Sequence, residues 1–136
     1  MADAETFLDA VRREMTFLLD EHGFCVARAD AHVVLLESTV LGVQLAWDPR
    51  GEVSVYVFRR DLGVAAEGWS YVGMVGRASV QRLLQIAGER MRAEPWVLAG
   101  EAAAYEQQAE RKRRESLEWT AYYSRKGPRP RTGQLP

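Results

Sequence analysis

The chain has 136 residues, of which 47% are hydrophobic and 27% are charged, and its net charge at neutral pH is −1. This size and composition fit one globular domain with a core large enough to fold without disulfides or a metal. The single cysteine, Cys25, excludes an intramolecular disulfide, and no apolar run approaches the roughly 20 residues of a membrane span. The N-terminal sequence has neither a signal-peptide nor a transit-peptide pattern, so we expect a cytoplasmic protein.

The first half of the chain predicts one helix followed by strands. Residues 4–22 carry apolar side chains at helical spacing, and Gly23 can end that helix in the left-handed conformation. Short segments with apolar alternation follow, separated by turn residues. These four expected strands are residues 24–28, 32–38, 40–47 and 52–59. They predict an antiparallel meander.

The turn Asp48-Pro49-Arg50-Gly51 predicts the best-defined part of this sheet. Proline suits the second position of a type I turn, and we expect Gly51 to supply the positive φ of a closing bulge. Placing Asp48 opposite Glu52 then fixes the register. The expected pairs are Trp47–Val53, Leu45–Val55 and Val43–Val57 on one face, and Ala46–Ser54, Gln44–Tyr56 and Gly42–Phe58 on the other.

Both faces of this sheet carry apolar residues. Val34, Leu36, Tyr56 and Phe58 cannot all face the N-terminal helix. A sheet that is apolar on both faces needs two covers. We expect the second cover to be the later helices or a partner chain.

The second half of the chain predicts a loop and two helices. Residues 60–76 are rich in glycine and are read as a loop, in which Trp69 to Val72 is the one candidate for a short strand. Helices are expected over 78–92 and 101–124. The fold class is thus α+β: an N-terminal helix, a four-stranded antiparallel meander and two C-terminal helices packing on the sheet. Residues 1–124 form a single domain, and 125–136 a basic, proline-rich tail.

The sequence contains no pattern that is typical of a catalytic or metal-binding site. His22, Cys25 and His32 are the classical metal ligands, but their spacing matches no metal motif. Cys25 lies on a predicted strand, where we expect it to be buried as a small apolar residue. The glycines of residues 73–76 lack the spacing of a dinucleotide-binding loop. We therefore expect no catalytic residue, no cofactor and no metal.

The third helix contains a run of four basic residues, 111–114, among acidic ones. Opposite charges four residues apart, such as Glu110 and Arg114, predict a solvated, self-neutralised helix face. Along the same helix a stripe starts at Tyr105 and ends at Trp119 and Tyr123, which lie about 21 Å from its first turns at 1.5 Å per residue. Tyrosine, tryptophan and arginine are typical anchors of protein interfaces, and they also stack nucleic-acid bases.

The charge of the chain is divided unevenly. Residues 1–124 hold 14 basic and 19 acidic residues, whereas residues 125–136 hold four basic residues and no acidic one. An acidic body does not attract phosphate backbones, so contact with protein is favoured over contact with nucleic acid.

The segments "FLLDEHGF", "VVLLEST" and "VQLAWDPRGEVSVYV" resemble those of small uncharacterised bacterial α+β proteins, some of which act as immunity proteins beside secreted toxins. The resemblance covers about residues 5–60 and rests on pattern. It implies a stoichiometric binding role and carries over no functional residue.

The sequence therefore predicts a non-enzymatic protein-binding module of immunity-like type, whose partner is another protein chain, with a homodimer expected and no membrane contact. A secretion-chaperone-like peptide binder and a nucleic-acid accessory protein that uses the tail are the alternatives. The expected interaction residues are Tyr56, Phe58, Trp119, Tyr122, Tyr123, Arg125, Lys126, Arg129 and Arg131.

Overall fold

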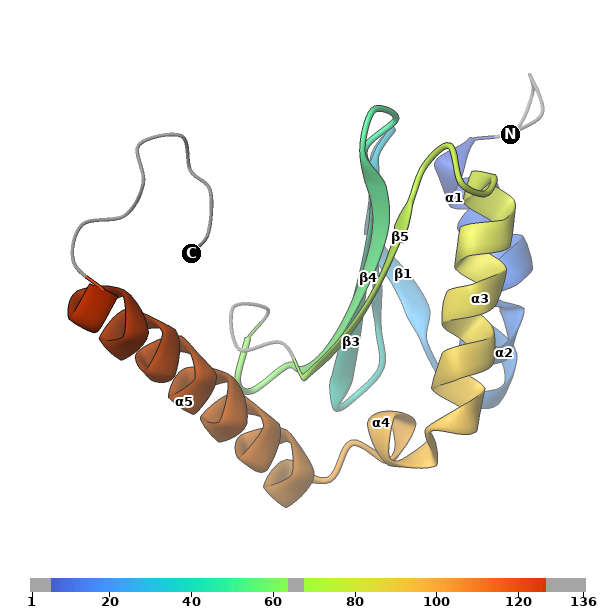
Figure 1. Ribbon diagram of the computed structural model, residues 1–136. Helices are drawn as coiled ribbons and strands as arrows, with labels where there is room; N and C mark the ends of the chain where they lie inside the picture. Colours follow the sequence, from blue (N-terminus) through green and yellow to red (C-terminus); the bar gives the residue numbers. More distant parts are fainter. Residues whose placement is uncertain (1–5, 64–67, 127–136) are drawn as a thin grey trace.

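The computed structural model describes residues 6–63 and 68–126, with the side chains of 125 and 126 left out. Within these residues the chain forms five strands and five helices (Figure 1). In chain order they are α1 (Phe7–Glu14), α2 (Thr16–Glu21), β1 (Cys25–Ala29), β2 (Val33–Glu37), β3 (Leu41–Trp47), β4 (Glu52–Arg59), β5 (Trp69–Met74), α3 (Val80–Ala93), α4 (Pro95–Ala99) and α5 (Ala102–Lys126).

The strands form one antiparallel sheet in the order β1-β2-β3-β4-β5. This confirms the α+β class and the antiparallel meander, but the expected number of four strands is wrong. The fifth strand, β5, pairs with β4 from Trp69 opposite Val57 to Met74 opposite Glu52. The sequence around β5 suggested a loop because glycine is disfavoured in strands. Gly73 is nevertheless required in this strand, because a Cβ at Gly73 would lie 2.4 Å from the Leu83 side chain.

The β3–β4 hairpin has the expected register, and all six predicted cross-strand pairs are present. The Asp48 amide donates to the carbonyl of Glu52, and the Gly51 amide donates to the carbonyl of Asp48. The predicted positive φ at Gly51 is wrong, because the glycines with positive φ in the described residues are Gly23, Gly63, Gly76 and Gly100. Gly51 instead leaves room for the Asp48 carboxylate, from which a Cβ would lie 2.9 Å.

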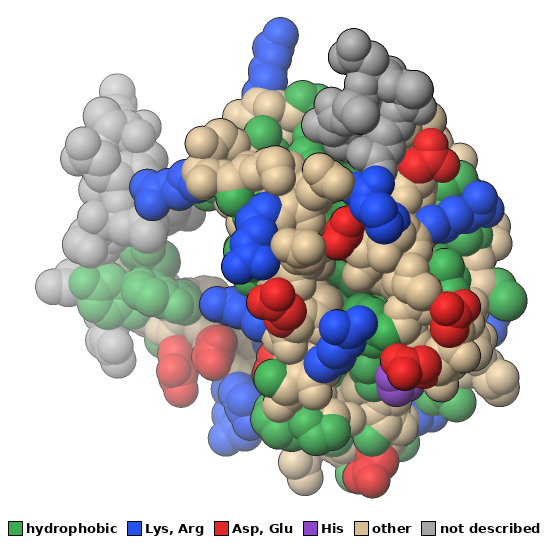
Figure 2. Space-filling view, turned by 90° about the vertical axis from the view of Figure 1, so that its right-hand side faces the viewer, with side chains coloured by type: hydrophobic (Ala, Val, Ile, Leu, Met, Phe, Trp, Pro, Cys, Tyr) green, Lys and Arg blue, Asp and Glu red, His purple; other side chains and the backbone are tan. Residues whose placement is uncertain are grey.

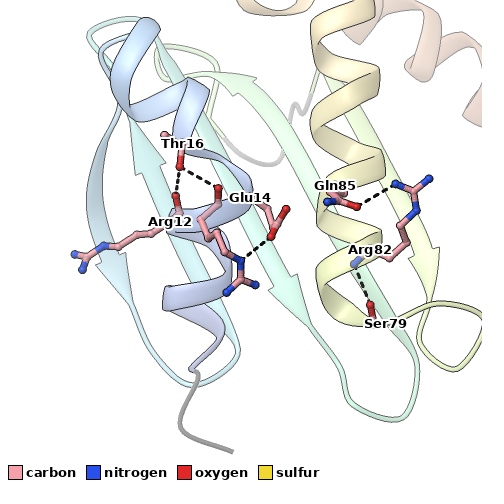
Figure 3. Close-up of polar contacts among 7 residues, drawn as sticks. Arg12, Glu14, Thr16, Ser79, Arg82 and Gln85 are labelled. Atoms are coloured by element: carbon pink, nitrogen blue, oxygen red, sulfur yellow. Dashed lines mark hydrogen bonds and ion pairs between the residues drawn. The ribbon is translucent and has the colours of Figure 1, made fainter. Parts of the chain in front are cut away.

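The expected helix over residues 4–22 is divided at Met15 into α1 and α2. Thr6 caps α1 in a reciprocal pair with Asp9. The Thr16 hydroxyl donates to the carbonyl oxygens of Arg12 and Arg13, a back-bonding that bends helices (Figure 3). Gly23 follows α2 with φ 71°, which confirms it as the left-handed residue that ends the helix.

One face of the sheet and three helices enclose the core. α1, α2 and α3 lie on the same side of the sheet (Figure 1). Their apolar stripes meet the inward side chains of β2, β3 and β4, which is the pattern expected of amphipathic helices on a sheet. The largest fully buried side chains are Phe7, Val11, Met15, Leu18, Val34, Leu36, Val43, Leu45, Val53, Leu84, Met91 and Tyr105.

The last helices depart from the expected arrangement. Pro95 ends α3 as expected but also begins the short helix α4, which was not predicted. α3 joins α1 and α2 on the core face, so it does not cover the opposite face. α5 touches the sheet near its own start and then runs away from it (Figure 1). The prediction that both C-terminal helices pack on the sheet therefore holds for α3 and fails for most of α5.

Candidate protein-interaction site

Two surfaces contain the predicted interaction residues. The first is the sheet face opposite α1, α2 and α3, here called the outer face. The cross-strand register places two rows of side chains on it. One row is Leu35, Gln44, Tyr56 and Ser70, and the other is Val33, Ala46, Ser54 and Val72. From β2 to β5 neither row contains a charged residue, whereas on β1 the charged Arg28 lies opposite Leu35.

The outer face and the helix-covered side of the domain present different kinds of side chain to the solvent. Val72 is 52% exposed and Met74, further along β5, is 50% exposed. The helix-covered face, by contrast, mixes Lys and Arg with Asp and Glu over its surface (Figure 2). The outer face thus presents exposed apolar side chains on β5, and no helix of the core layer covers it.

Phe58 and Tyr56 occupy this outer face in different ways. Phe58 is 6% exposed, and its ring lies over Gly42, where a Cβ would approach the ring to 2.3 Å. Phe58 thus covers backbone within its own sheet. Tyr56 is half-buried in the middle of the face. Of the two, Tyr56 has a surface that a partner can reach.

The second surface is the C-terminal end of α5, and Tyr105 fixes the direction in which that helix leaves the domain. The Tyr105 side chain is fully buried, and its hydroxyl donates a hydrogen bond to the carbonyl oxygen of Val97. The ring of Trp69 meets it edge-on, with centroids 4.8 Å apart. Burial raises the pKa of the Tyr105 phenol, so the group remains a neutral donor.

The connection before α5 is held by one side chain of β4. The Arg59 guanidinium donates to the carbonyl oxygen of Gly100 and to both carboxylate oxygens of Asp61. Gly100 has φ 67°, a left-handed conformation that ends α4 and turns the chain into α5. Arg59 and Tyr105 together position the start of α5 against the domain.

Most of α5 beyond its first turns is exposed. Residues 113–121 are all exposed, and Leu117 and Trp119 are 62% and 55% exposed. In Figure 2 the hydrophobic side chains at the far end of α5 stand clear of the body. Glu110 forms an ion pair with Arg113, three residues on, where the four-residue spacing to Arg114 was expected.

The three aromatic residues near the end of α5 form a cluster. The rings of Trp119 and Tyr123 stack with centroids 5.7 Å apart, and Tyr122 meets both rings edge-on. Such pairs hold one another in a defined arrangement. The structure thus brings together three of the predicted residues at one end of a helix.

The basic residues of the prediction extend beyond this cluster. Arg125 and Lys126 end α5, and their side chains are not among those described. Arg129 and Arg131 lie outside the described residues, as does the rest of the tail. The nucleic-acid alternative, which depends on that tail, stays a prediction. So does the secretion-chaperone alternative, which would need a helix between pairs of strands, whereas β1 to β5 follow one another in the described chain.

A cavity of about 150 Å³ between α3 and the sheet is lined mainly by apolar side chains, among them Val53 and Leu83. At its margin the Tyr71 hydroxyl donates to Glu94 at 3.2 Å, and burial together with that carboxylate raises the pKa of Tyr71. A phenol in this state keeps its proton at neutral pH and acts as a hydrogen-bond donor.

The candidate ligands His22, Cys25 and His32 do not converge. Among the described residues, no group of three or more His, Cys, Asp and Glu side chains could hold a metal ion. The expectation that Cys25 is buried is wrong, because its side chain is exposed. It begins the edge strand β1, where all positions except Val26 are exposed, and Phe24 just before it enters the core instead.

Sequence reasoning missed part of the outer face. Ser70, Val72 and Met74 belong to β5, whereas the sequence predicted a loop with at most a short strand from Trp69 to Val72. A usable signal was present, since no charged residue occurs from Gly68 to Gly76 and the aromatic residues Trp69 and Tyr71 alternate with Ser70 and Val72. Leu117 was missed because it falls outside the stripe that begins at Tyr105.

None of the helices in the described chain is sufficiently long and apolar to cross a membrane. No protein-family model matches the sequence, and neither the curated proteins nor the solved structures provide a match.

Proposed function

We propose that this protein is a non-enzymatic protein-binding module that acts through the end of α5 and the outer face of its sheet. The observation that carries the proposal is the exposure of Trp119 on a helix that has left its own domain. Large aromatic residues favour burial, and an exposed one beside two tyrosines is typical of an interface anchor.

The geometry of α5 suits binding for a second reason. From Tyr105 to Tyr123 the helix rises about 27 Å at 1.5 Å per residue, and neither glycine nor proline interrupts α5. Its start is held by the hydrogen bond of Tyr105 and by Arg59. A partner therefore meets a preformed helix and loses little free energy in ordering it.

The binding role also agrees with the chemistry that the described residues offer. The buried phenols of Tyr71 and Tyr105 are held as neutral donors, and both of their hydroxyls already bond within the domain. A stoichiometric binder needs no reactive group, and its affinity depends on a few aromatic anchors.

A photo-reactive amino acid placed at position 119 tests the proposal in cells that express the full chain. We expect one discrete protein adduct at position 119. Position 114 is the matched control, since Arg114 is exposed on the same helix and points to a different side. An absence of adducts at 119, or equal adduct yields at the two positions, would contradict the proposal.

A further inference from the structure

We propose that the partner is a second copy of this chain, and that two copies exchange their α5 helices so that the Trp119 end of each lies on the outer face of the other. This inference rests on the proposed function and identifies its partner. The proposed contact joins the Trp119 end of α5 to the outer face of the sheet, two surfaces that lie apart within one chain.

The outer face suits an aromatic helix end. From β2 to β5 its two central rows contain no charge, and apolar side chains lie across it from Val33 and Leu35 on β2 to Val72 on β5. Tyr56 stands half-buried between them. An uncharged, partly apolar face of this kind is desolvated at low cost, and Trp119 and its neighbouring rings can pack on it.

A single chain cannot close this contact by itself. The start of α5 is fixed by Tyr105 and Arg59, and the helix then continues to Lys126 without a break. Its axis diverges from the sheet (Figure 1). Bringing Trp119 onto its own outer face would require a sharp kink early in α5, where helices kink at proline or glycine and α5 contains neither. Within the described residues, both surfaces therefore remain available to another chain.

The contact area favours a second copy over an unrelated partner. Five strands spaced about 4.8 Å apart and about five residues long on this face cover roughly 400 Å². A stable interface buries about 800 Å² on each partner. One α5 end on one outer face reaches about half of that area. In a two-fold exchange this contact forms twice. Each chain then buries one helix end and one outer face, and the buried area reaches about 800 Å² per chain.

The exchange is symmetric, because each chain offers the same helix end and the same outer face to the other. The two-fold symmetry closes the assembly at two copies.

Light scattering on the full chain tests the dimer, with single substitutions at exposed positions. We expect a mass twice the 15.4 kDa of one chain, and at least tenfold weaker self-association for Trp119→Ala and for Val72→Lys. The matched control is Trp96→Ala, because Trp96 on α4 is 50% exposed, close to the 55% of Trp119. Circular dichroism verifies that each variant is folded.

Mixing the two defective variants separates exchange from other dimers. Trp119→Ala retains an intact outer face and Val72→Lys retains an intact α5, so the mixture forms one complete contact that neither variant forms alone. We expect a heterodimer at concentrations where each variant is monomeric, and we expect it to be weaker than the wild-type dimer because it has one complete contact and not two. A wild-type chain that stays monomeric overturns the inference, and so does a Val72→Lys variant that dimerises like wild type, since that result indicates pairing of α5 with α5.

The outcome also separates this inference from the proposed function. If position 119 forms an adduct in cells with a protein of another mass while the purified chain is monomeric, the protein-binding role stands and the second copy is excluded as the partner. If position 119 forms no adduct and the chain is monomeric, both proposals fail.

Discussion

The hydroxyl of Tyr105 donates a hydrogen bond to the carbonyl oxygen of Val97, and this bond joins the first turns of α5 to α4. The ring of Tyr105 also fills the space above Gly68, where a Cβ would lie 2.3 Å from it. Together with Arg59, this buried side chain thus fixes how a helix of 25 residues leaves the domain. The position of the exposed aromatic cluster depends on this contact.

Tyr105→Phe removes the hydroxyl and keeps the ring. We expect a loss of about 1–3 kcal/mol in the free energy of unfolding, because the carbonyl of Val97 loses its side-chain donor in a buried place. Urea denaturation measures the change. Tyr123→Phe is the matched control on the same helix, because Tyr123 is only partly buried, and at a concentration where the chain is monomeric we expect it to change stability by less than about 0.5 kcal/mol. Equal effects of the two substitutions would refute the anchoring role of Tyr105.

Alkaline pH gives an independent measurement of the same buried phenol. Burial raises the pKa of Tyr105 above its ordinary value in the folded state. The folded chain therefore holds this proton more tightly than the unfolded chain does. The resulting stability is complete below about pH 10, the ordinary tyrosine pKa, and is lost as the pH rises above it. We expect Tyr105→Phe to flatten the fall in stability between about pH 10 and 12, as seen by urea denaturation at several pH values.

Local signals explain what could be predicted about the fold. The turn at Asp48 to Gly51 and the alternation on both sides of it lie within a few residues, so they fixed the β3–β4 register correctly. The cap at Gly23 is equally local. Even the wrong reason given for Gly51 did not disturb the register, because the hydrogen bonds between Asp48 and Glu52 close the hairpin in either case.

The errors about β5 and α5 concern contacts between distant segments. β5 exists because it pairs with β4 and because Gly73 admits the side chain of Leu83 from α3, and neither contact is visible in the local pattern. Helical spacing placed Tyr105 and Trp119 on one stripe correctly. It could not show that the start of the stripe is buried and its end exposed, since that depends on where α5 leaves the sheet. The candidate site was therefore predicted as a set of residues, and its geometry was not.

Gly42→Ala tests the cover that Phe58 provides. A Cβ at this position would lie 2.3 Å from Cζ of the Phe58 ring, so the ring must move. We expect a loss of about 1–3 kcal/mol in the free energy of unfolding, as for other overpacked sites. In a Phe58→Leu background the loss should be smaller, because the shorter side chain leaves space. Additive effects in this double-mutant cycle would show that Phe58 does not lie over Gly42.

Ser79→Ala tests the start of α3. The Ser79 hydroxyl accepts a hydrogen bond from the amide of Arg82 at 3.1 Å, and the Arg82 side chain bonds Gln85 one turn later (Figure 3). Loss of an N-cap of this kind costs about 0.5–2 kcal/mol. The control is Ser70→Ala, because Ser70 is exposed on β5. A thermal unfolding midpoint that falls equally in both variants would contradict a specific capping role.

Two tryptophans separate the folding role of α5 from its binding role. Trp69 packs edge-on against Tyr105 with centroids 4.8 Å apart, whereas Trp119 is 55% exposed at the far end of the helix. We expect Trp69→Ala to reduce the free energy of unfolding by about 3 kcal/mol, as for other packed aromatic residues. Trp119→Ala should change it by less than about 0.5 kcal/mol when measured at a concentration where the chain is monomeric. If Trp119→Ala is as destabilising as Trp69→Ala under those conditions, Trp119 belongs to the folded core of the single chain and does not act as a binding anchor.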